Sequence, residues 1–69
     1  MKQKTNKPNY MKAARALRND MTQAELAELC GVNTATILYI EKGTKKPSLE
    51  LARKIAAALG TSVDQLFKM

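Results

Sequence analysis

The sequence predicts an all-α fold, a compact domain of five short helices. Its apolar residues are mostly Ala, Leu, Ile and Met, with only 4% aromatic residues, and this composition favours helices over strands. Residues that commonly cap helices recur along the chain, each followed by apolar residues at spacings of three and four. With 69 residues, the chain has room for one small domain.

Residues 1–9 are expected to form a flexible basic arm, because they are polar and include a proline that resists helix formation. The arm carries Lys2, Lys4 and Lys7. It serves either as a solubilising tail or as a contact to a polyanion, and the sequence leaves both interpretations open.

The first predicted helix begins after Asn9, which can cap it, and ends at Asn19-Asp20. Its expected core-facing side consists of Tyr10, Ala13, Ala14, Leu17 and Met21. The second helix begins after Thr22, which can form a capping box with Glu25. Its apolar residues are Ala24, Leu26, Ala27, Leu29 and Cys30, and we expect the cysteine to fill the core.

A third helix follows almost at once. Gly31 suits the left-handed position that ends the second helix, and Asn33 caps the third. Ile37 and Ile40 are spaced for one buried side, and the lack of apolar–polar alternation argues against a strand. Gly43 ends this helix.

Two further helices complete the predicted domain. Ser48 caps the fourth helix after a basic loop at residues 44–47, and Gly60 ends it. The apolar stripe of this helix is Leu51, Ile55, Ala58 and Leu59. Ser62 caps a last short helix that contains Val63, Leu66 and Phe67.

The second and third helices are predicted to form a helix-turn-helix. The turn has only Val32 between Gly31 and the cap Asn33, and Ala27 is small enough for two helices to cross closely. Val32, Ile37 and Ile40 then pack behind the third helix and fix its angle. A helix held in this way protrudes and fits the DNA major groove, which is about 12 Å wide.

Composition restricts the classes of function. Twelve Lys and Arg against six Asp and Glu give a formal charge of +6, which attracts polyanions. One cysteine and no histidine argue against an internal disulfide, a zinc site and histidine chemistry, and no nucleophile–base pair suggests an enzyme. Because no apolar run approaches the ~20 residues of a membrane span, we expect a cytoplasmic protein.

Several short motifs occur in a fixed order along the chain. They are T-Q-x-E-L-A from Thr22, the Gly31-Val32 turn, I-x-x-I-E-x-G from Ile37 to Gly43, P-S-L-E from Pro47 to Glu50, and a closing A-L-G. The chain from about Tyr10 to Phe67 thereby resembles the helix-turn-helix domain of the phage Cro and C1 repressor family. The resemblance implies a lambda-repressor-like domain over residues 10–69 that binds double-stranded DNA without a cofactor or metal. It also implies a bacterial or phage-type transcriptional regulator, a repressor or autoregulator, that is nucleoid-associated when bound.

The resemblance implies that the exposed side of the third helix meets base edges. The residues concerned are Thr34, Ala35, Leu38 and Tyr39, and helical spacing also places them outward if Ile37 and Ile40 are buried. None of the four can make the bidentate contacts that Arg and Gln make to purines. We therefore expect modest direct readout, helped by thymine methyl contacts and DNA shape. Alternatively, Leu38 and Tyr39 pack on a partner protein or on the fourth helix.

Phosphate contacts are expected on both sides of this helix. The resemblance implies them for Gln23 and Asn33, although Gln23 alternatively only caps its helix. The following loop supplies further candidates: Lys42, Gly43, Thr44, Lys45 and Lys46. The family also often pairs the residue at Glu41 with an arginine of the first helix, but that position falls on Ala16, between Arg15 and Arg18. Which of the two arginines pairs with Glu41, if either does, is left open.

One recognition helix reads only a few base pairs, so we expect a weak homodimer on DNA. The candidate dimer contacts are Val63, Leu66, Phe67 and Met69. A protein-interaction or antitoxin-like module on the same scaffold is the alternative function. The sequence does not indicate the operator, the regulated gene, an effector or the sign of regulation.

Overall fold

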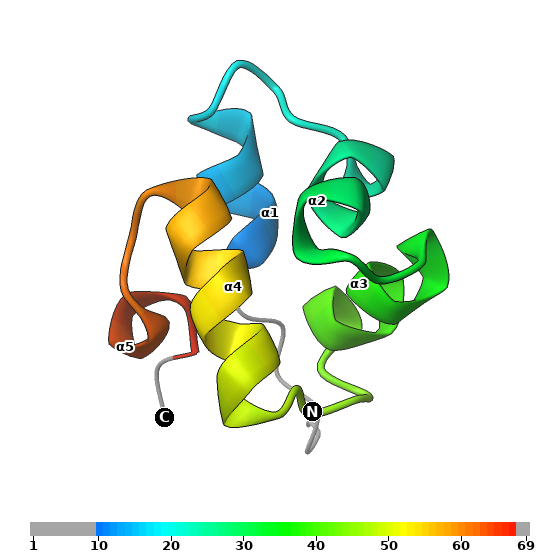
Figure 1. Cartoon of the computed structure of the whole chain (residues 1–69). Helices are drawn as coiled ribbons and strands as arrows, with labels where there is room; N and C mark the ends of the chain where they lie inside the picture. The colour runs from blue at the N-terminus through cyan, green and yellow to red at the C-terminus, as the bar shows by residue number, and fades with distance from the viewer. Residues whose placement is uncertain (1–9, 68–69) are drawn as a thin grey trace, which may run out of the picture.

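The computed structural model describes residues 10–67 and folds them into five α-helices without a strand (Figure 1). The helices are α1 (Met11–Ala16), α2 (Gln23–Cys30), α3 (Thr34–Lys42), α4 (Leu49–Leu59) and α5 (Val63–Leu66). The predicted all-α fold of five helices is thereby confirmed. The expected basic arm, with Lys2, Lys4 and Lys7, and the dimer candidate Met69 lie outside the described residues.

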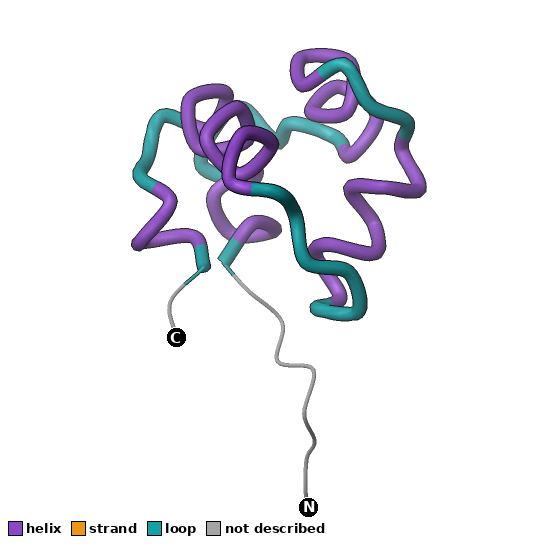
Figure 2. Tube along the Cα trace, turned by 60° about the horizontal axis from the view of Figure 1, so that its bottom comes forward, coloured by secondary structure: helices purple, strands orange, loops and turns teal. Residues whose placement is uncertain are grey.

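The longest helix, α4, lies at the centre of the arrangement. It packs against α2 on one side and α5 on the other, and α2 also packs against α3. Figure 2 shows the two ends of the described chain side by side, where the Tyr10 amide donates to the Leu66 carbonyl at 3.1 Å. The core therefore lies between α4 and the helix pair α2–α3, and α1 closes one end of it.

The helix starts follow the local capping signals. Thr22 and Glu25 form the predicted capping box, with the Glu25 amide donating to Thr22 Oγ1 at 3.0 Å and the Thr22 amide donating to Glu25 Oε1 at 2.9 Å. The side chains of Asn33, Ser48 and Ser62 accept from the third amide of their helices. The caps predicted for α2 to α5 are confirmed, because the side chain of each accepts from a helix amide that has no partner within the helix. In α1 the N-cap is Tyr10, without a side-chain cap, and not the predicted Asn9.

The first helix differs from its prediction. It begins at Met11 rather than at Tyr10 and ends at Ala16, after which Asn19 and Asp20 adopt positive φ angles of 59° and 55°. Met11 is fully buried, whereas the expected core residues Tyr10 and Leu17 are 57% and 86% exposed and Ala13 is exposed too. Of the predicted stripe, Ala14 and Met21 pack against the core, whereas Tyr10, Ala13 and Leu17 are exposed, because the helix ends at Ala16 and does not carry Leu17 onto the inner side.

The core is aliphatic. Its buried residues are Met11, Leu26, Ala27, Cys30, Ile37, Ile40, Ala52, Ile55, Ala56, Leu59 and Leu66. Cys30 fills the core as predicted, while Leu29, expected among the apolar residues of α2, is 63% exposed. In α4, Ile55 and Leu59 are buried as expected, but Leu51 and Ala58 are only partly buried and lie at the edge of the core.

Candidate nucleic-acid interface

The turn between α2 and α3 fixes the orientation of α3. Gly31 adopts the left-handed conformation, with φ 73°, and the Val32 amide then donates to the Ala27 carbonyl at 3.0 Å. Asn33 is extended, and it starts α3 in a new direction. Ala27 is 2% exposed, as expected for a small residue where two helices cross. The predicted helix-turn-helix is present in α2 and α3.

The two sides of α3 differ sharply in exposure. Ile37 and Ile40 are buried, with exposed fractions of 0% and 1%. The residues predicted to meet base edges lie on the outer side and are all exposed: Thr34, Ala35, Leu38 and Tyr39. Leu38 and Tyr39 are 37% and 48% exposed, so neither side chain is buried within the chain. The outer face of α3 is available to a ligand.

A hydrogen-bonded network connects α3 to the two preceding helices. Arg15 donates from Nε to Glu41 Oε2 at 2.6 Å and from Nη2 to Glu41 Oε1 at 3.0 Å. Nη1 of the same arginine donates to the Met21 carbonyl at 2.8 Å. The two charged side chains are only 12% and 8% exposed. The arginine that pairs with Glu41 is therefore Arg15, which α1 carries on its inner side, and not Arg18.

Gln23 joins this network from the first turn of α2. Its Nε2 donates to Glu41 Oε1 at 3.1 Å, and the side chain is partly buried. Thr22 supplies the side-chain cap of α2, so the Gln23 side chain is not needed for capping. No local sequence pattern indicates the contact between Gln23 and Glu41, because the two residues are 18 positions apart.

Asn33 and Thr36 form a second polar unit at the start of α3. Asn33 Oδ1 accepts from the Thr36 amide at 3.1 Å and from the Thr36 hydroxyl at 2.9 Å. Thr36 was not among the predicted site residues. The spacing of three between a cap and a hydroxyl residue was the signal that could have indicated it.

The loop after α3 folds back onto the carbonyl of Tyr39. This oxygen accepts from the Thr44 amide at 3.1 Å, the Thr44 hydroxyl at 3.1 Å and the Lys45 amide at 3.2 Å. Gly43, with φ 82°, makes the reversal possible. The loop thus holds Lys42, Lys45 and Lys46 beyond the C-terminal end of α3, all exposed. Among the described residues, no carboxylate lies within 4.0 Å of their amines.

Comparison with known proteins decides the family. A helix-turn-helix family model matches residues 11–66, which include all five helices. The chain belongs to the Cro/C1-type helix-turn-helix family. The resemblance stated from its motifs is confirmed, and the family consists of DNA-binding regulators of transcription rather than enzymes.

Relatives of this helix-turn-helix protein occur in archaea and bacteria. An uncharacterized HTH-type transcriptional regulator of Methanocaldococcus jannaschii is 48% identical over 59 residues, which cover 86% of this chain and 88% of the relative. The cryptic phage CTXphi transcriptional repressor RstR of Vibrio cholerae is 38% identical over 50 residues, or 72% of this chain and 45% of RstR.

A solved structure has the same fold. The clp gene regulator ClgR from Corynebacterium glutamicum aligns with a TM-score of 0.70 and 36% sequence identity, over 77% of this chain. The chain spans 55% of the length of ClgR. The likeness therefore concerns the helix-turn-helix domain of that regulator.

The predicted dimer contacts at the C-terminal end are less available than expected. Leu66 is 1% exposed and belongs to the core of its own chain, so it cannot also contact a partner. Val63 and Phe67 are half-buried and pack against that core.

Within residues 10–67, every helix is too short or too polar to span a membrane.

Proposed function

We propose that this helix-turn-helix protein inserts α3 into the major groove of double-stranded DNA and regulates transcription in the cytoplasm, as a repressor or autoregulator, by occupying a promoter. The exposed outer face of α3, opposite the buried Ile37 and Ile40, carries the proposal. It gains support from the relative RstR, which is named a transcriptional repressor.

Base readout on this face uses small and apolar groups. Ala35 and Leu38 contact thymine methyl groups, and the hydroxyls of Thr34 and Tyr39 each make one hydrogen bond to a base edge. Such contacts discriminate less than a bidentate arginine does, which is worth about 1–3 kcal/mol against a wrong base. DNA shape then supplies the remaining specificity.

Phosphates are bound on both flanks of α3. Asn33 and Gln23 lie at the starts of α3 and α2, where free amides and the helix dipole favour an anion. The loop after α3 contacts phosphates through Lys42, Gly43, Thr44, Lys45 and Lys46. Lys2, Lys4 and Lys7 add further phosphate contacts. These contacts fix the register of the protein on DNA without reading the sequence.

Two copies bind one operator, because the few base pairs read by a single helix do not define a genomic site. The half-sites then lie about one helical turn apart and are related by two-fold symmetry. Val63 and Phe67 are the C-terminal residues still available to such a dimer, and they contribute little exposed apolar surface.

Selection of bound duplexes from a random oligonucleotide pool tests this function. We expect enrichment of a short half-site rich in thymine, and an affinity for the selected duplex roughly a thousandfold above that for random DNA. A matched selection with Tyr39→Ala and Leu49→Ala variants shows whether α3 is the reader. Tyr39→Ala should lower the ratio of selected to random affinity about tenfold, while Leu49→Ala, at the start of α4 and not on the outer face of α3, leaves it unchanged.

A protein-interaction module is the second candidate, favoured by the exposure of Leu38 and Tyr39 and by the absence of Arg and Gln on the outer face of α3. The two functions differ in their response to salt. Phosphate contacts are strongest at low salt. Absence of any DNA binding at about 50 mM salt would therefore favour this candidate and contradict the DNA-binding proposal.

A further inference from the structure

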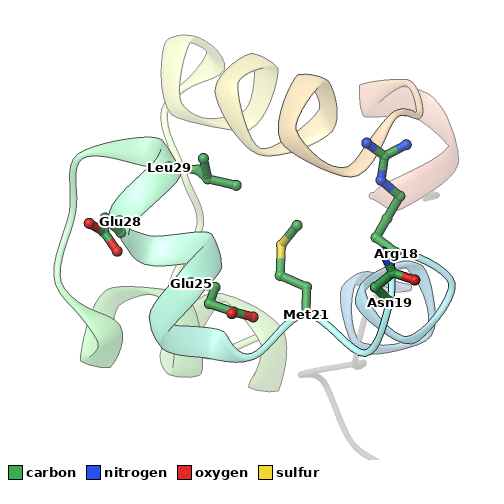
Figure 3. Close-up of a pocket in the computed structure, with 6 residues that line it drawn as sticks. All are labelled: Arg18, Asn19, Met21, Glu25, Glu28 and Leu29. Atoms are coloured by element: carbon green, nitrogen blue, oxygen red, sulfur yellow. The ribbon is translucent and has the colours of Figure 1, made fainter.

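A second exposed apolar surface lies away from α3. Leu17 and Leu29 are 86% and 63% exposed, the highest values among the large hydrophobic residues of the described chain. Between them the turn after α1 and the outer side of α2 form a shallow, open pocket (Figure 3). The pocket is lined by Arg18, Asn19, Met21, Glu25, Glu28 and Leu29, and we call it, together with Leu17, the α1–α2 surface.

Charges lie at opposite ends of this surface. Figure 3 shows Arg18 at one end, Glu25 and Glu28 toward the other, and the side chains of Met21 and Leu29 between them. Neither Arg18 nor Glu28 has an ion-pair partner within 4.0 Å among the described residues. Arg18 extends alongside the end of α4, where a Cβ on Gly60 would approach its Nη1 to 2.6 Å.

A surface with an apolar centre, a cation at one end and carboxylates at the other is complementary to itself. Rotation by 180° about an axis that lies in the plane of contact, at right angles to the line from Arg18 to Glu28, brings Arg18 of each copy to the acidic end of the other. This relation is the one that a two-fold interface requires, because the same patch must fit on both sides. We propose that the α1–α2 surface binds a second copy of this chain, with Leu17, Met21 and Leu29 in contact and Arg18 paired with Glu28 across the axis.

The second copy leaves the outer face of α3 free. No residue of α3 or of the loop after it lines the pocket, so docking there does not cover Thr34, Ala35, Leu38 or Tyr39. The association is weak, because a stable interface buries about 800 Å² on each partner and three apolar side chains supply only part of that area. The inference does not depend on DNA binding, since the contact involves protein alone.

Sedimentation equilibrium of the full chain without DNA, over a series of protein concentrations, measures this association. We expect Leu29→Ser to weaken the dimer at least tenfold. The control is Leu49→Ser, which removes a leucine of similar exposure (61%) at the start of α4 and should leave the dimer unchanged. Equal effects of the two variants would show that no defined surface is involved.

Charge reversal tests the predicted pair directly. Arg18→Glu and Glu28→Arg should each weaken the dimer roughly tenfold, because a two-fold interface contains the altered pair twice and replaces attraction by repulsion. The double variant restores opposite charges and should regain most of the affinity. Circular dichroism melting follows folding in parallel, since Arg18→Glu also places a negative charge near the C-terminal end of α4.

The outcomes separate this proposal from the proposed function. A dimer that weakens in both single variants and recovers in the double variant supports the α1–α2 surface, whatever the protein does on DNA. A strictly monomeric chain up to millimolar concentration, or single and double variants that weaken association equally, overturns the proposal. Dimer loss on changing Val63 or Phe67 but not Leu29 would assign the contact to the C-terminal end instead.

Discussion

Single residues on the inner side of α3 decide how that helix is held. Glu41 accepts hydrogen bonds from Arg15 and Gln23, so its carboxylate touches one residue of α1 and one of α2. A carboxylate that is 8% exposed requires such partners, because removing a charge from water is otherwise costly. The network thus makes the position of α3 depend on both preceding helices.

Removing the Arg15 guanidinium leaves the buried carboxylate of Glu41 without its cation. We expect Arg15→Met to lower the free energy of unfolding by about 3 kcal/mol, measured by urea denaturation. Lys54→Met provides the matched control, because Lys54 and Glu50 form an ion pair at 4.0 Å whose side chains are 55% and 83% exposed. That variant should change stability by less than about 0.5 kcal/mol, and similar losses in both variants would refute a special role for Arg15.

Cys30 gives the folded protein a measurable pH dependence. Burial raises the pKa of its thiol above the ordinary value of 9.0, and the positive charge of Lys54 opposes the shift in part. The pKa is therefore higher in the folded state than in the unfolded state. The stability that this thiol contributes is fully present below pH 9.0 and is lost as the pH rises through the folded pKa.

Comparing the wild type with Cys30→Ala measures this effect. The substitution also lowers stability by an amount independent of pH, through loss of core contacts. Unfolding measured between neutral pH and about pH 10 should therefore show a steeper decline for the wild type than for the variant, since lysines titrate equally in both. Parallel curves would contradict the raised pKa.

At the scale of elements, the short turn between α2 and α3 sets the angle at which α3 protrudes. Gly31 has φ 73°, a conformation that side chains with a Cβ rarely adopt. Apart from its own residue and its two chain neighbours, no atom lies within 4 Å of the position where its Cβ would be, so a substitution meets backbone strain and no clash.

Gly31→Ala should lower the free energy of unfolding by about 1 kcal/mol, through this backbone strain alone. Gly31→Asn provides the comparison, because asparagine tolerates the left-handed region better and should lose less. Thermal or urea unfolding measures both. A larger loss for asparagine than for alanine would show that space, and not φ, limits this position.

At the scale of the whole molecule, charge and shape work together. The chain carries a net charge of +6, which creates a field that attracts polyanions. The loop after α3 concentrates part of this charge beside the exposed helix face, because its hydrogen bonds to Tyr39 hold the lysines there.

Replacing both Lys45 and Lys46 by alanine tests this arrangement. Binding should weaken alike for selected and random DNA, and the slope of log affinity against log salt should flatten by about two units. Gel shifts or fluorescence titrations at several salt concentrations give the slope. Lys54→Ala with Arg53→Ala, a double change on α4, is the control for net charge, and an equal flattening there would remove the loop from the interface.

Much of the fold could be predicted because its signals are local. The caps Thr22, Asn33, Ser48 and Ser62 each bond to an amide three residues away, so their function does not depend on the rest of the molecule. The inward positions of Ile37 and Ile40 follow from helical spacing in the same way. The outer face of α3, and hence the candidate site, was predictable for that reason.

The remaining features depend on distant parts of the chain. Arg15 and Glu41 are 26 residues apart, and no local pattern distinguishes Arg15 from Arg18 as the partner. Leu66 was assigned to a dimer surface although it completes the core beneath α4 and α5. The apolar spacing of α1 favoured Tyr10 and Leu17, but packing buried Met11 instead.

By itself, the sequence determined where α2 to α4 begin and end, where α5 begins and which side of α3 faces outward, because capping and helical periodicity act within a few residues. Only the tertiary structure decided which side of the short α1 faces inward, which arginine holds Glu41, and which leucines remain exposed on α1 and α2. A helix of six residues has too few internal hydrogen bonds to fix its own register, so its contacts with the other helices fix it.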